Sequence, residues 1–258
     1  MPVRTHPFAD RLAVVTGGAR GLGLAVAREL AQRGANIALL DVQDEVARAA
    51  RELASDTGRQ ALGLTCDITD EVSIAQALDA IEAHLGPVDH LVCAAGVASV
   101  QPALEVTAQD FRRVIDINLT GTFLACQAVA RRLVAAGRPG TIVNFGSMSG
   151  YVANRPQDQV AYNASKAAVT MLTRSLAVEW LEWGIRVNSI APGYMATDMT
   201  RQFVDQHPEM LRDWNSRTPM GRMGEPHEIT GLVCFLLGDE ASYITGQDYL
   251  VDGGYTLI

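Results

Sequence analysis

The segment Leu12-Ala-Val-Val-Thr-Gly-Gly-Ala-Arg-Gly-Leu-Gly23 joins an apolar strand to a glycine-rich turn and the start of a helix. Glycines at 17, 21 and 23 give the spacing G-x-x-x-G-x-G, which permits a tight turn and brings backbone N–H groups close to a diphosphate. The helical pattern at 22–33 ends before Gly34, and a second apolar run follows at 36–41. This order of strand, glycine turn, helix and strand is typical of a dinucleotide-binding site.

Asp41 closes the second apolar run, about twenty residues after the glycines. A carboxylate there accepts hydrogen bonds from the adenosine ribose and repels a 2'-phosphate, which favours NAD over NADP. Arg20 argues the other way, because a basic side chain inside the glycine turn can meet a 2'-phosphate. We give Asp41 more weight, since Val42 and Gln43 supply no second cation and a buried carboxylate facing a phosphate is costly. A helix N-cap is the structural alternative for Asp41.

Tyr162 and Lys166 lie four residues apart in Ala161-Tyr-Asn-Ala-Ser-Lys166, so they project from one face of a helix. A tyrosine ionises at about pH 10, and a cation held against the phenol favours the phenolate and lowers its pKa toward working pH. An isolated pair of this kind is more often two solvated residues on an amphipathic helix. The dinucleotide pattern upstream favours a catalytic pair instead.

Several further motifs follow in order: Cys66-Asp-Ile68, Cys93-Ala-Ala-Gly96, Ile115-Asp-Ile-Asn-Leu119, Ser147 and Pro192-Gly193 with Thr197. With the glycine turn and the Tyr–Lys pair, they make the chain resemble the short-chain dehydrogenase/reductase family from about Arg11 to Tyr255. The family usually has asparagine at the position of Cys93, so the strand-joining role of that amide must be supplied differently or lost. The cofactor-binding residues that the resemblance implies are Gly17, Arg20, Gly21, Leu22, Gly23, Asp41, Asp67, Ile68, Ala94, Gly96, Tyr162, Lys166, Pro192, Gly193 and Thr197. Among them, Asp67 is expected to meet the adenine ring, and Pro192, Gly193 and Thr197 to form the loop over the nicotinamide.

The resemblance also implies a catalytic set of Asn118, Ser147, Tyr162 and Lys166. Hydride transfer between a carbinol and a nicotinamide needs a base for the hydroxyl proton, a donor that fixes the oxygen, and a positioned ring. Tyr162 is expected to be the base for oxidation and the acid for reduction, Lys166 to keep its pKa low and bind the nicotinamide ribose, and Ser147 to hold the substrate oxygen. Asn118 is expected to orient a water or a backbone carbonyl behind Lys166, although a helix-interior amide at a kink is the alternative.

The turn Gly146-Ser-Met-Ser-Gly150 offers two candidate serines. Ser149 is thirteen residues before Tyr162, the usual family spacing, whereas Ser147 is fifteen residues before it. The strand at 141–145 fixes which residue reaches the site, while the loop after it can lengthen freely, so we choose Ser147. Ser149 then becomes a second hydroxyl beside a two-residue insertion.

This insertion points to the substrate. Ser149 and Asn154 add small polar groups beside Ser147 and Tyr162, and a pocket of this kind suits a substrate with several hydroxyls. The runs Asn154-Arg-Pro-Gln157 and Val251-Asp-Gly-Gly-Tyr-Thr256 are similar to polyol dehydrogenases of the family, which implies NAD-dependent oxidation of a sugar alcohol to a ketose. The alternatives are an NADP-dependent 3-oxoacyl carrier-protein reductase, a hydrophobic-alcohol dehydrogenase and a non-catalytic NAD(H)-sensing regulator; Asn154 could also be an ordinary turn residue.

Length and pattern predict one α/β domain over 1–258, a Rossmann fold with a doubly wound, seven-stranded parallel sheet flanked by helices. Helices at about 195–218 are expected to cover the substrate. The expected strands are 12–16, 36–41, 61–66, 88–94, 141–146, 185–191 and 247–251.

Composition restricts the partners of the chain. A net charge of −8 argues against nucleic acid or an anionic membrane, and no apolar window long enough to span a membrane or signal peptide is visible, so a cytoplasmic enzyme is expected. The four cysteines and five histidines show no zinc spacing, so no catalytic metal is expected. The helix expected at 160–183 is apolar on more than one stripe, and the resemblance implies a homotetramer; a well-packed core helix is the alternative.

Overall fold

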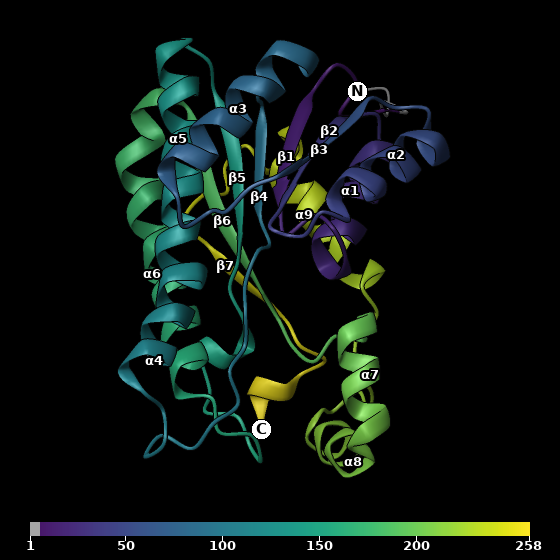
Figure 1. Cartoon of the computed structure of the whole chain (residues 1–258), viewed down its shortest axis with the longest axis vertical. Helices are drawn as coiled ribbons and strands as arrows, with labels where there is room; N and C mark the ends of the chain where they lie inside the picture. The colour runs from purple at the N-terminus through teal and green to yellow at the C-terminus, as the bar shows by residue number, and fades with distance from the viewer. Residues whose placement is uncertain (1–5) are drawn as a thin grey trace.

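Seven parallel strands form the central sheet of the computed structural model, which describes residues 6–258, in the order β3-β2-β1-β4-β5-β6-β7 (Figure 1). Their bounds are β1 Leu12–Thr16, β2 Asn36–Asp41, β3 Ala61–Thr65, β4 His90–Cys93, β5 Gly140–Phe145, β6 Ile185–Pro192 and β7 Asp248–Val251. The predicted doubly wound, seven-stranded parallel sheet is confirmed. The predicted strand bounds agree to within two residues, and β4 ends at Cys93 because the chain then turns to line a cavity.

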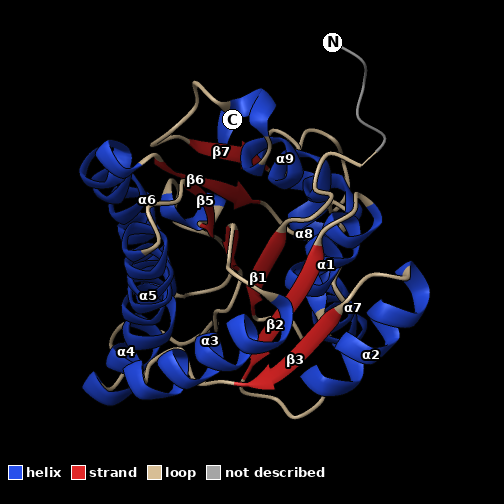
Figure 2. Cartoon of the chain, turned by 90° about the horizontal axis from the view of Figure 1, so that it is seen from above, coloured by secondary structure: helices blue, strands red, loops and turns tan. Residues whose placement is uncertain are grey.

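Helices cover both faces of this sheet (Figure 2). One face carries α1 (Gly21–Gln32), α2 (Val46–Thr57) and α9 (His227–Leu237), and α1 packs against the other two. The other face carries α3 (Glu71–Leu85), α4 (Ala108–Ile115), α5 (Thr122–Ala135) and α6 (Val160–Trp180). A π-helical turn, Asp116–Gly121, joins α4 to α5, and short 3₁₀ turns occupy Met148–Gly150, Leu181–Trp183, Asp239–Ala241 and Tyr255–Leu257.

The core consists of two apolar clusters separated by the sheet. In β1, Ala13 and Val15 belong to the cluster under α1, α2 and α9, while Leu12 and Val14 belong to the cluster under α3, α5 and α6. Successive strand side chains point to opposite faces, so a strand covered on both sides must be apolar throughout. Burial of a large apolar side chain such as Leu12, Val14 or Val15 contributes about 1.5–3 kcal/mol, which makes the sheet a rigid base for the loops at its edge.

The chain runs outward from β1 to β3 and then returns to β4 beside β1, so the strand order reverses between β1 and β4. In open α/β sheets, ligands bind at the carboxyl ends of the strands next to such a reversal. Two more helices, α7 (Asp198–Gln206) and α8 (Pro208–Arg217), follow β6 and extend beyond the sheet at the bottom of Figure 1. They fall within the helical segment predicted at about 195–218.

Candidate active site

A cavity of about 1350 Å³ opens along the carboxyl edge of the sheet. It runs from the glycine turn, past Ser147 and Tyr162, to Phe203 on α7 and Trp214 on α8. The cavity therefore joins the predicted dinucleotide site to the predicted catalytic residues in one continuous space.

The glycine turn forms a cradle that side chains would block. Gly17 has φ of +64°, and a Cβ there would lie 2.7 Å from the backbone nitrogen of Ala95. A Cβ on Gly23 would collide with the carbonyl of Gly17. Helix α1 starts at Gly21 without a side-chain cap, so the N–H groups of its first turn are available to an anion. Gly17, Gly21, Gly23 and the intervening Leu22 line the cavity, and this cradle fits the diphosphate of a dinucleotide.

Asp41 ties the end of β2 to the glycine turn. Its Oδ2 accepts a hydrogen bond from the backbone N–H of Ala19 at 3.0 Å, and its Oδ1 accepts one from that of Gln43 at 3.1 Å. The N-cap alternative does not hold, because Glu45 stands at the N-cap of α2 and no side chain caps that helix. Asp41 lines the cavity together with Arg20, so the two residues with opposite implications for the 2'-phosphate face the same space.

Asp67 and Ile68 form the next stretch of wall. Asp67 Oδ1 accepts hydrogen bonds from the backbone N–H and hydroxyl of Thr69, at 2.8 and 2.7 Å, which holds the turn after β3 in shape. Ile68 packs on Gly121 of the π-helical turn, where a Cβ would lie 2.8 Å from Ile68 Cδ1. These residues therefore place an apolar side chain and an acceptor at the expected adenine end.

Tyr162 and Lys166 lie one turn apart on α6, with the Lys166 ammonium 5.7 Å from the centre of the phenol ring. Lys166 is buried and donates a hydrogen bond to the carbonyl of Phe145 at 2.7 Å. Ser147 follows the end of β5, and its Oγ accepts a hydrogen bond from the backbone N–H of Ser149 at 3.1 Å. Ser147, Tyr162 and Lys166 all line the cavity.

Burial controls the titration of this pair. It raises the pKa of Tyr162 above its ordinary value, and a hydrogen bond with Ser147 opposes the rise. Of the two serines, Ser147 is the one that affects the pKa of the phenol, and its catalytic role stays a prediction. Burial also lowers the pKa of Lys166 to about 8, against the opposing charge of the Asp248 carboxylate. The expected lowering of the phenol's pKa by Lys166 is wrong for this structure, because the ammonium is engaged by Phe145 and burial of the phenol prevails.

Asn118 lies inside the π-helical turn and is fully buried. Its Oδ1 accepts from the backbone N–H of Val97 at 2.8 Å, and its Nδ2 donates to the Val97 carbonyl at 2.9 Å and to Ser165 Oγ at 3.0 Å. Gly96 lies next to Asn118. A Cβ on Gly96 would lie 3.2 Å from Asn118 Oδ1 and 3.6 Å from Lys166 Nζ. Asn118 does not line the cavity; it positions the segment after β4, including Ala94 and Gly96, against α6.

The cysteine that replaces the usual asparagine forms part of a polar chain in the core. Cys93 Sγ lies 3.7 Å from Cys126 Sγ, and Cys126 donates to Asn144 Oδ1 at 3.3 Å. Asn144 Nδ2 donates in turn to Thr173 Oγ1 at 3.0 Å. These contacts link β4, α5, β5 and α6, so two thiols and one amide connect neighbouring elements at the position where the family usually has an asparagine.

Pro192, Gly193 and Thr197 bring the start of the helical cover to the cofactor cradle. A Cβ on Gly193 would lie 2.7 Å from Asp252 Cα, so the chain after β6 can approach β7 only at a glycine. Thr197 Oγ1 accepts a hydrogen bond from the backbone N–H of Thr200 at 3.3 Å and caps α7. All three residues line the cavity, as the motif predicts for the nicotinamide end.

The structure corrects the role expected for Asn154, which is buried but does not line the cavity. Its Oδ1 accepts from Gln159 Nε2 at 2.9 Å, and its Nδ2 donates to the hydroxyl of Tyr194 at 3.2 Å. Both ends of the amide are thus engaged by protein groups, so Asn154 supports the pocket wall. Ser149 does line the cavity, as expected.

Four residues of the substrate end were absent from the predicted site: Gln157, Gln159, Tyr194 and Trp214. Gln157 donates to the Tyr194 hydroxyl at 2.9 Å and accepts from Trp214 Nε1 at 3.1 Å. The rings of Tyr194 and Trp214 are stacked, with centres 4.1 Å apart. The two glutamines just before Tyr162 could have been predicted as site residues, because a buried amide usually has a hydrogen-bonding role. No pattern in the sequence indicated that Trp214 on α8 would contact them.

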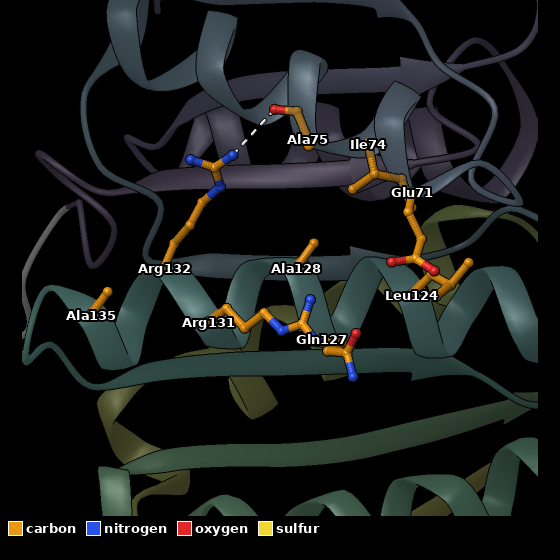
Figure 3. Close-up of a pocket in the computed structure, with 9 residues that line it drawn as sticks. All are labelled: Glu71, Ile74, Ala75, Leu124, Gln127, Ala128, Arg131, Arg132 and Ala135. Carbon is orange, nitrogen blue, oxygen red and sulfur yellow. Dashed lines mark hydrogen bonds between the residues drawn. The ribbon is translucent and has the colours of Figure 1, made fainter.

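A second, smaller cavity of about 320 Å³ lies between α3 and α5 (Figure 3), and none of the predicted site residues lines it. Arg132 reaches across it to the carbonyl of Ala75 at 3.1 Å and pairs with Asp79 at 2.7 Å and Glu82 at 2.9 Å. These contacts join the two helices, and the groove contains none of the catalytic set.

The fold and the site define a class: an oxidoreductase in which a glycine cradle and a Ser, Tyr and Lys set line one cavity. The family model described as "Enoyl-(Acyl carrier protein) reductase" matches residues 17–256. The chain is 45% identical to a galactitol 2-dehydrogenase (L-tagatose-forming) of Cereibacter sphaeroides, over 95% of this chain and 94% of the relative.

The chain is also similar to solved structures of dehydrogenases. A short-chain type dehydrogenase/reductase from Mycobacterium marinum is 40% identical, with a TM-score of 0.93 and 98% of each chain covered. A gluconate 5-dehydrogenase from Burkholderia cenocepacia, solved in complex with NADP and tartrate, is 34% identical, with a TM-score of 0.91 and 98% of each chain covered. The chain belongs to the short-chain dehydrogenase/reductase family, and it is an oxidoreductase that uses a nicotinamide cofactor.

Proposed function

We propose that the chain is an NAD-dependent polyol dehydrogenase that oxidises a secondary alcohol of a sugar alcohol or 1,2-diol to a ketose or hydroxyketone. The observation that carries this proposal is the polar wall formed by Ser147, Ser149 and Gln159 beside Tyr162. Such a wall leaves several hydrogen bonds unmade when the substrate has a single hydroxyl, and this selects against sterols and acyl chains. The similarity to a galactitol dehydrogenase supports the same class.

The residues of the site divide the chemistry between them. The nicotinamide, when bound, supplies the acceptor for the hydride. Tyr162 takes the proton from the substrate hydroxyl, and Ser147 donates a hydrogen bond to the reacting oxygen. Lys166 holds the nicotinamide ribose and keeps a positive charge near the phenol. Because the pKa of Tyr162 is raised, the rate of oxidation should rise with pH until Lys166, whose pKa is about 8, loses its proton.

Asn118 does not line the cavity and acts by positioning groups next to Ser147, Tyr162 and Lys166. It fixes the backbone of Val97, which follows Gly96 beside Lys166, and so orients the groups through which the proton from Tyr162 reaches solvent. A water held between Asn118 and Lys166 is the simplest such route.

NAD is the proposed cofactor because the buried Asp41 carboxylate faces the expected position of the adenosine ribose. The charge of Arg20 in the same wall supports NADP instead, and the similar gluconate 5-dehydrogenase was solved with NADP. Asp41 is anchored at both oxygens, whereas Arg20 is exposed and makes no ion pair within residues 6–258, so the carboxylate is the more firmly placed of the two charges.

A homotetramer in the cytoplasm is the proposed state of the enzyme. Met171, Val178 and Leu181 lie exposed on or just after α6, with 57%, 81% and 53% of their surface accessible. Leu176 and Trp180 of the same helix are buried in the core, so α6 is apolar on two sides, and a second copy of the chain would cover the exposed one. Within the described part of the chain, no helix has the length and apolar character needed to cross a membrane.

Steady-state NADH formation at alkaline pH tests the proposed function. Sugar alcohols, simple 1,2-diols, a sterol and, in the reverse direction, a 3-oxoacyl thioester would each be supplied with NAD(H) and with NADP(H). Turnover of polyols or diols with NAD supports the proposal. Exclusive turnover of the thioester with NADPH contradicts it, and NADH binding without any turnover would favour a sensor of the cofactor.

A further inference from the structure

Gln159 is held tightly at the beginning of α6, three residues before Tyr162. Its Nε2 lies 2.9 Å from Asn154 Oδ1, 2.9 Å from Asn163 Oδ1 and 3.2 Å from Ser149 Oγ. Its backbone forms an isolated parallel bridge with Gln101, which lies on the loop between β4 and α4. Only 8% of the residue is exposed, so both the backbone and the side-chain nitrogen have fixed positions.

Gln159 Nε2 has too few hydrogens to bond all three neighbouring oxygens, so the Ser149 hydroxyl is left without this bond. A primary amide nitrogen carries two hydrogens, whereas three oxygens surround Gln159 Nε2. The two shorter contacts lead to the oxygens of Asn154 and Asn163, which can only accept. The Ser149 hydroxyl has the longest contact and can also donate, so its proton is available to a ligand in the cavity that it lines.

The other end of Gln159 is an acceptor without a protein donor. Its Oε1 receives no hydrogen bond from residues 6–258, although the side chain lines the same cavity as Ser147, Ser149 and Tyr162. An acceptor on the wall of the cavity that no protein group occupies is open to a hydrogen-bond donor of a ligand. Gln157 differs, because its Nε2 donates to Tyr194 and its Oε1 accepts from Trp214.

We propose that Gln159 Oε1 accepts a hydrogen bond from the substrate hydroxyl next to the reacting carbinol, while Ser149 donates to that same hydroxyl. Gln159 is then the residue that makes the site select a 1,2-diol unit. This inference rests on the proposed alcohol oxidation, in which Tyr162 and Ser147 hold the reacting oxygen. A hydroxyl donates one hydrogen bond and accepts another, so the acceptor of Gln159 and the donor of Ser149 match one neighbouring hydroxyl.

The test compares substrates that differ by one hydroxyl, in the full-length enzyme with its cofactor. kcat/KM is measured for 1,2-butanediol and 2-butanol with the wild type and with Gln159→Met, which has a similar length but no polar group. In the wild type the diol should be preferred by about tenfold or more, the loss expected for one unmade hydrogen bond in a closed site. In Gln159→Met the ratio of kcat/KM for the diol to that for 2-butanol should fall to nearly one, chiefly because kcat/KM for the diol decreases.

Gln157→Met is the matched control, because it removes the same group from a residue whose amide is fully engaged by Tyr194 and Trp214. It should slow both alcohols by a similar factor and leave the ratio between them unchanged. If Gln159→Met does not fold, as judged by NADH binding, Gln159→Asn provides the same comparison with the amide withdrawn by one methylene.

The outcomes separate the two proposals. A wild type that oxidises neither alcohol nor any sugar alcohol overturns the proposed function. A wild type that prefers the diol, together with Gln159 variants that keep this preference, overturns the inference about Gln159 alone. Loss of the preference in the Gln159 variants, with the ratio retained in Gln157→Met, supports it.

Discussion

The two ends of the cavity are built in different ways. The cofactor end, around Gly17, Gly23 and Asp41, is shaped by backbone conformation and by contacts close to strand ends. The substrate end is shaped by hydrogen bonds between side chains, and those that join Gln157 to Tyr194 and Trp214 connect residues that are far apart in the sequence. The first kind of site needs specific glycines and can be recognised by spacing; the second needs only compatible partners, so its residues can vary while the fold persists.

The largest effect on activity is expected from Tyr162, which lines the cavity between its cofactor end and its substrate end. Tyr162→Phe removes the group that takes the substrate proton and should lower kcat by about 10²–10⁴-fold. NADH binding should change little, because the ring remains in place beside Lys166. Single-turnover kinetics and fluorescence titration with NADH measure the two quantities, and near-normal turnover would show that another group is the base.

At the cofactor end, Gly17→Ala should abolish dinucleotide binding and lower stability. Alanine in the left-handed region costs about 1–2 kcal/mol, and the Cβ would also collide with Ala95. Gly58→Ala is a matched control, since Gly58 has φ of +67° but nothing within 4 Å of its Cβ position. The difference in free energy of unfolding between the two variants isolates the collision, and equal values would mean that the cradle is not tightly packed.

Asp41→Asn should reduce the preference for NAD over NADP by about tenfold or more, because it removes a charge that repels the 2'-phosphate. The amide keeps an oxygen that can accept from Ala19 or Gln43, so the glycine turn should retain its shape. The ratio of kcat/KM for the two cofactors measures the effect. If Arg20→Ala shifts this ratio and Asp41→Asn does not, the assignment of cofactor preference to Asp41 is wrong.

A smaller effect is expected from Asp248, whose carboxylate opposes the lowering of the pKa of Lys166 to about 8. In Asp248→Asn the pKa of Lys166 should fall further, so the ammonium loses its proton at a lower pH. The alkaline decline of kcat should therefore begin at a lower pH than in the wild type, by less than about one unit because Asp248 makes no direct ion pair with Lys166.

The groups around Lys166 allow a control for this shift. Tyr162 and Cys93 also face the ammonium, and neither is altered in Asp248→Asn. Tyr151→Phe removes the hydrogen bond that Tyr151 donates to Asp248 at 2.8 Å but keeps the carboxylate charge. Its pH profile should match the wild type on the alkaline side; a shift of equal size in both variants would mean that loop position, not charge, is responsible.

The sequence predicted the sheet, the glycine cradle and the Tyr–Lys pair because each depends on local spacing. The period of a strand, the glycine spacing of a tight turn and the four-residue step of a helix are all visible in a short window. Asn154 was placed in the pocket because it lies near Ser147 along the chain, but its amide turns to Tyr194 and Gln159. Side-chain direction in a loop depends on distant partners, which no local pattern specifies.

The pKa of Tyr162 was mispredicted for a related reason. Helical spacing brings Lys166 near the phenol, but the carbonyl of Phe145, on a different element, engages the ammonium. The pKa of Tyr162 depends on how β5 packs against α6. It therefore cannot be predicted from residue spacing along one helix.

The most direct test of the account is the rate of NADH formation by the wild type with a sugar alcohol and with a monohydric secondary alcohol of similar length, each with NAD and with NADP. The account predicts that the sugar alcohol with NAD has the highest kcat/KM of the four combinations, about tenfold or more above the monohydric alcohol. Equal rates for the two alcohols would contradict the role of the polar wall, and a clear preference for NADP would contradict the role of Asp41.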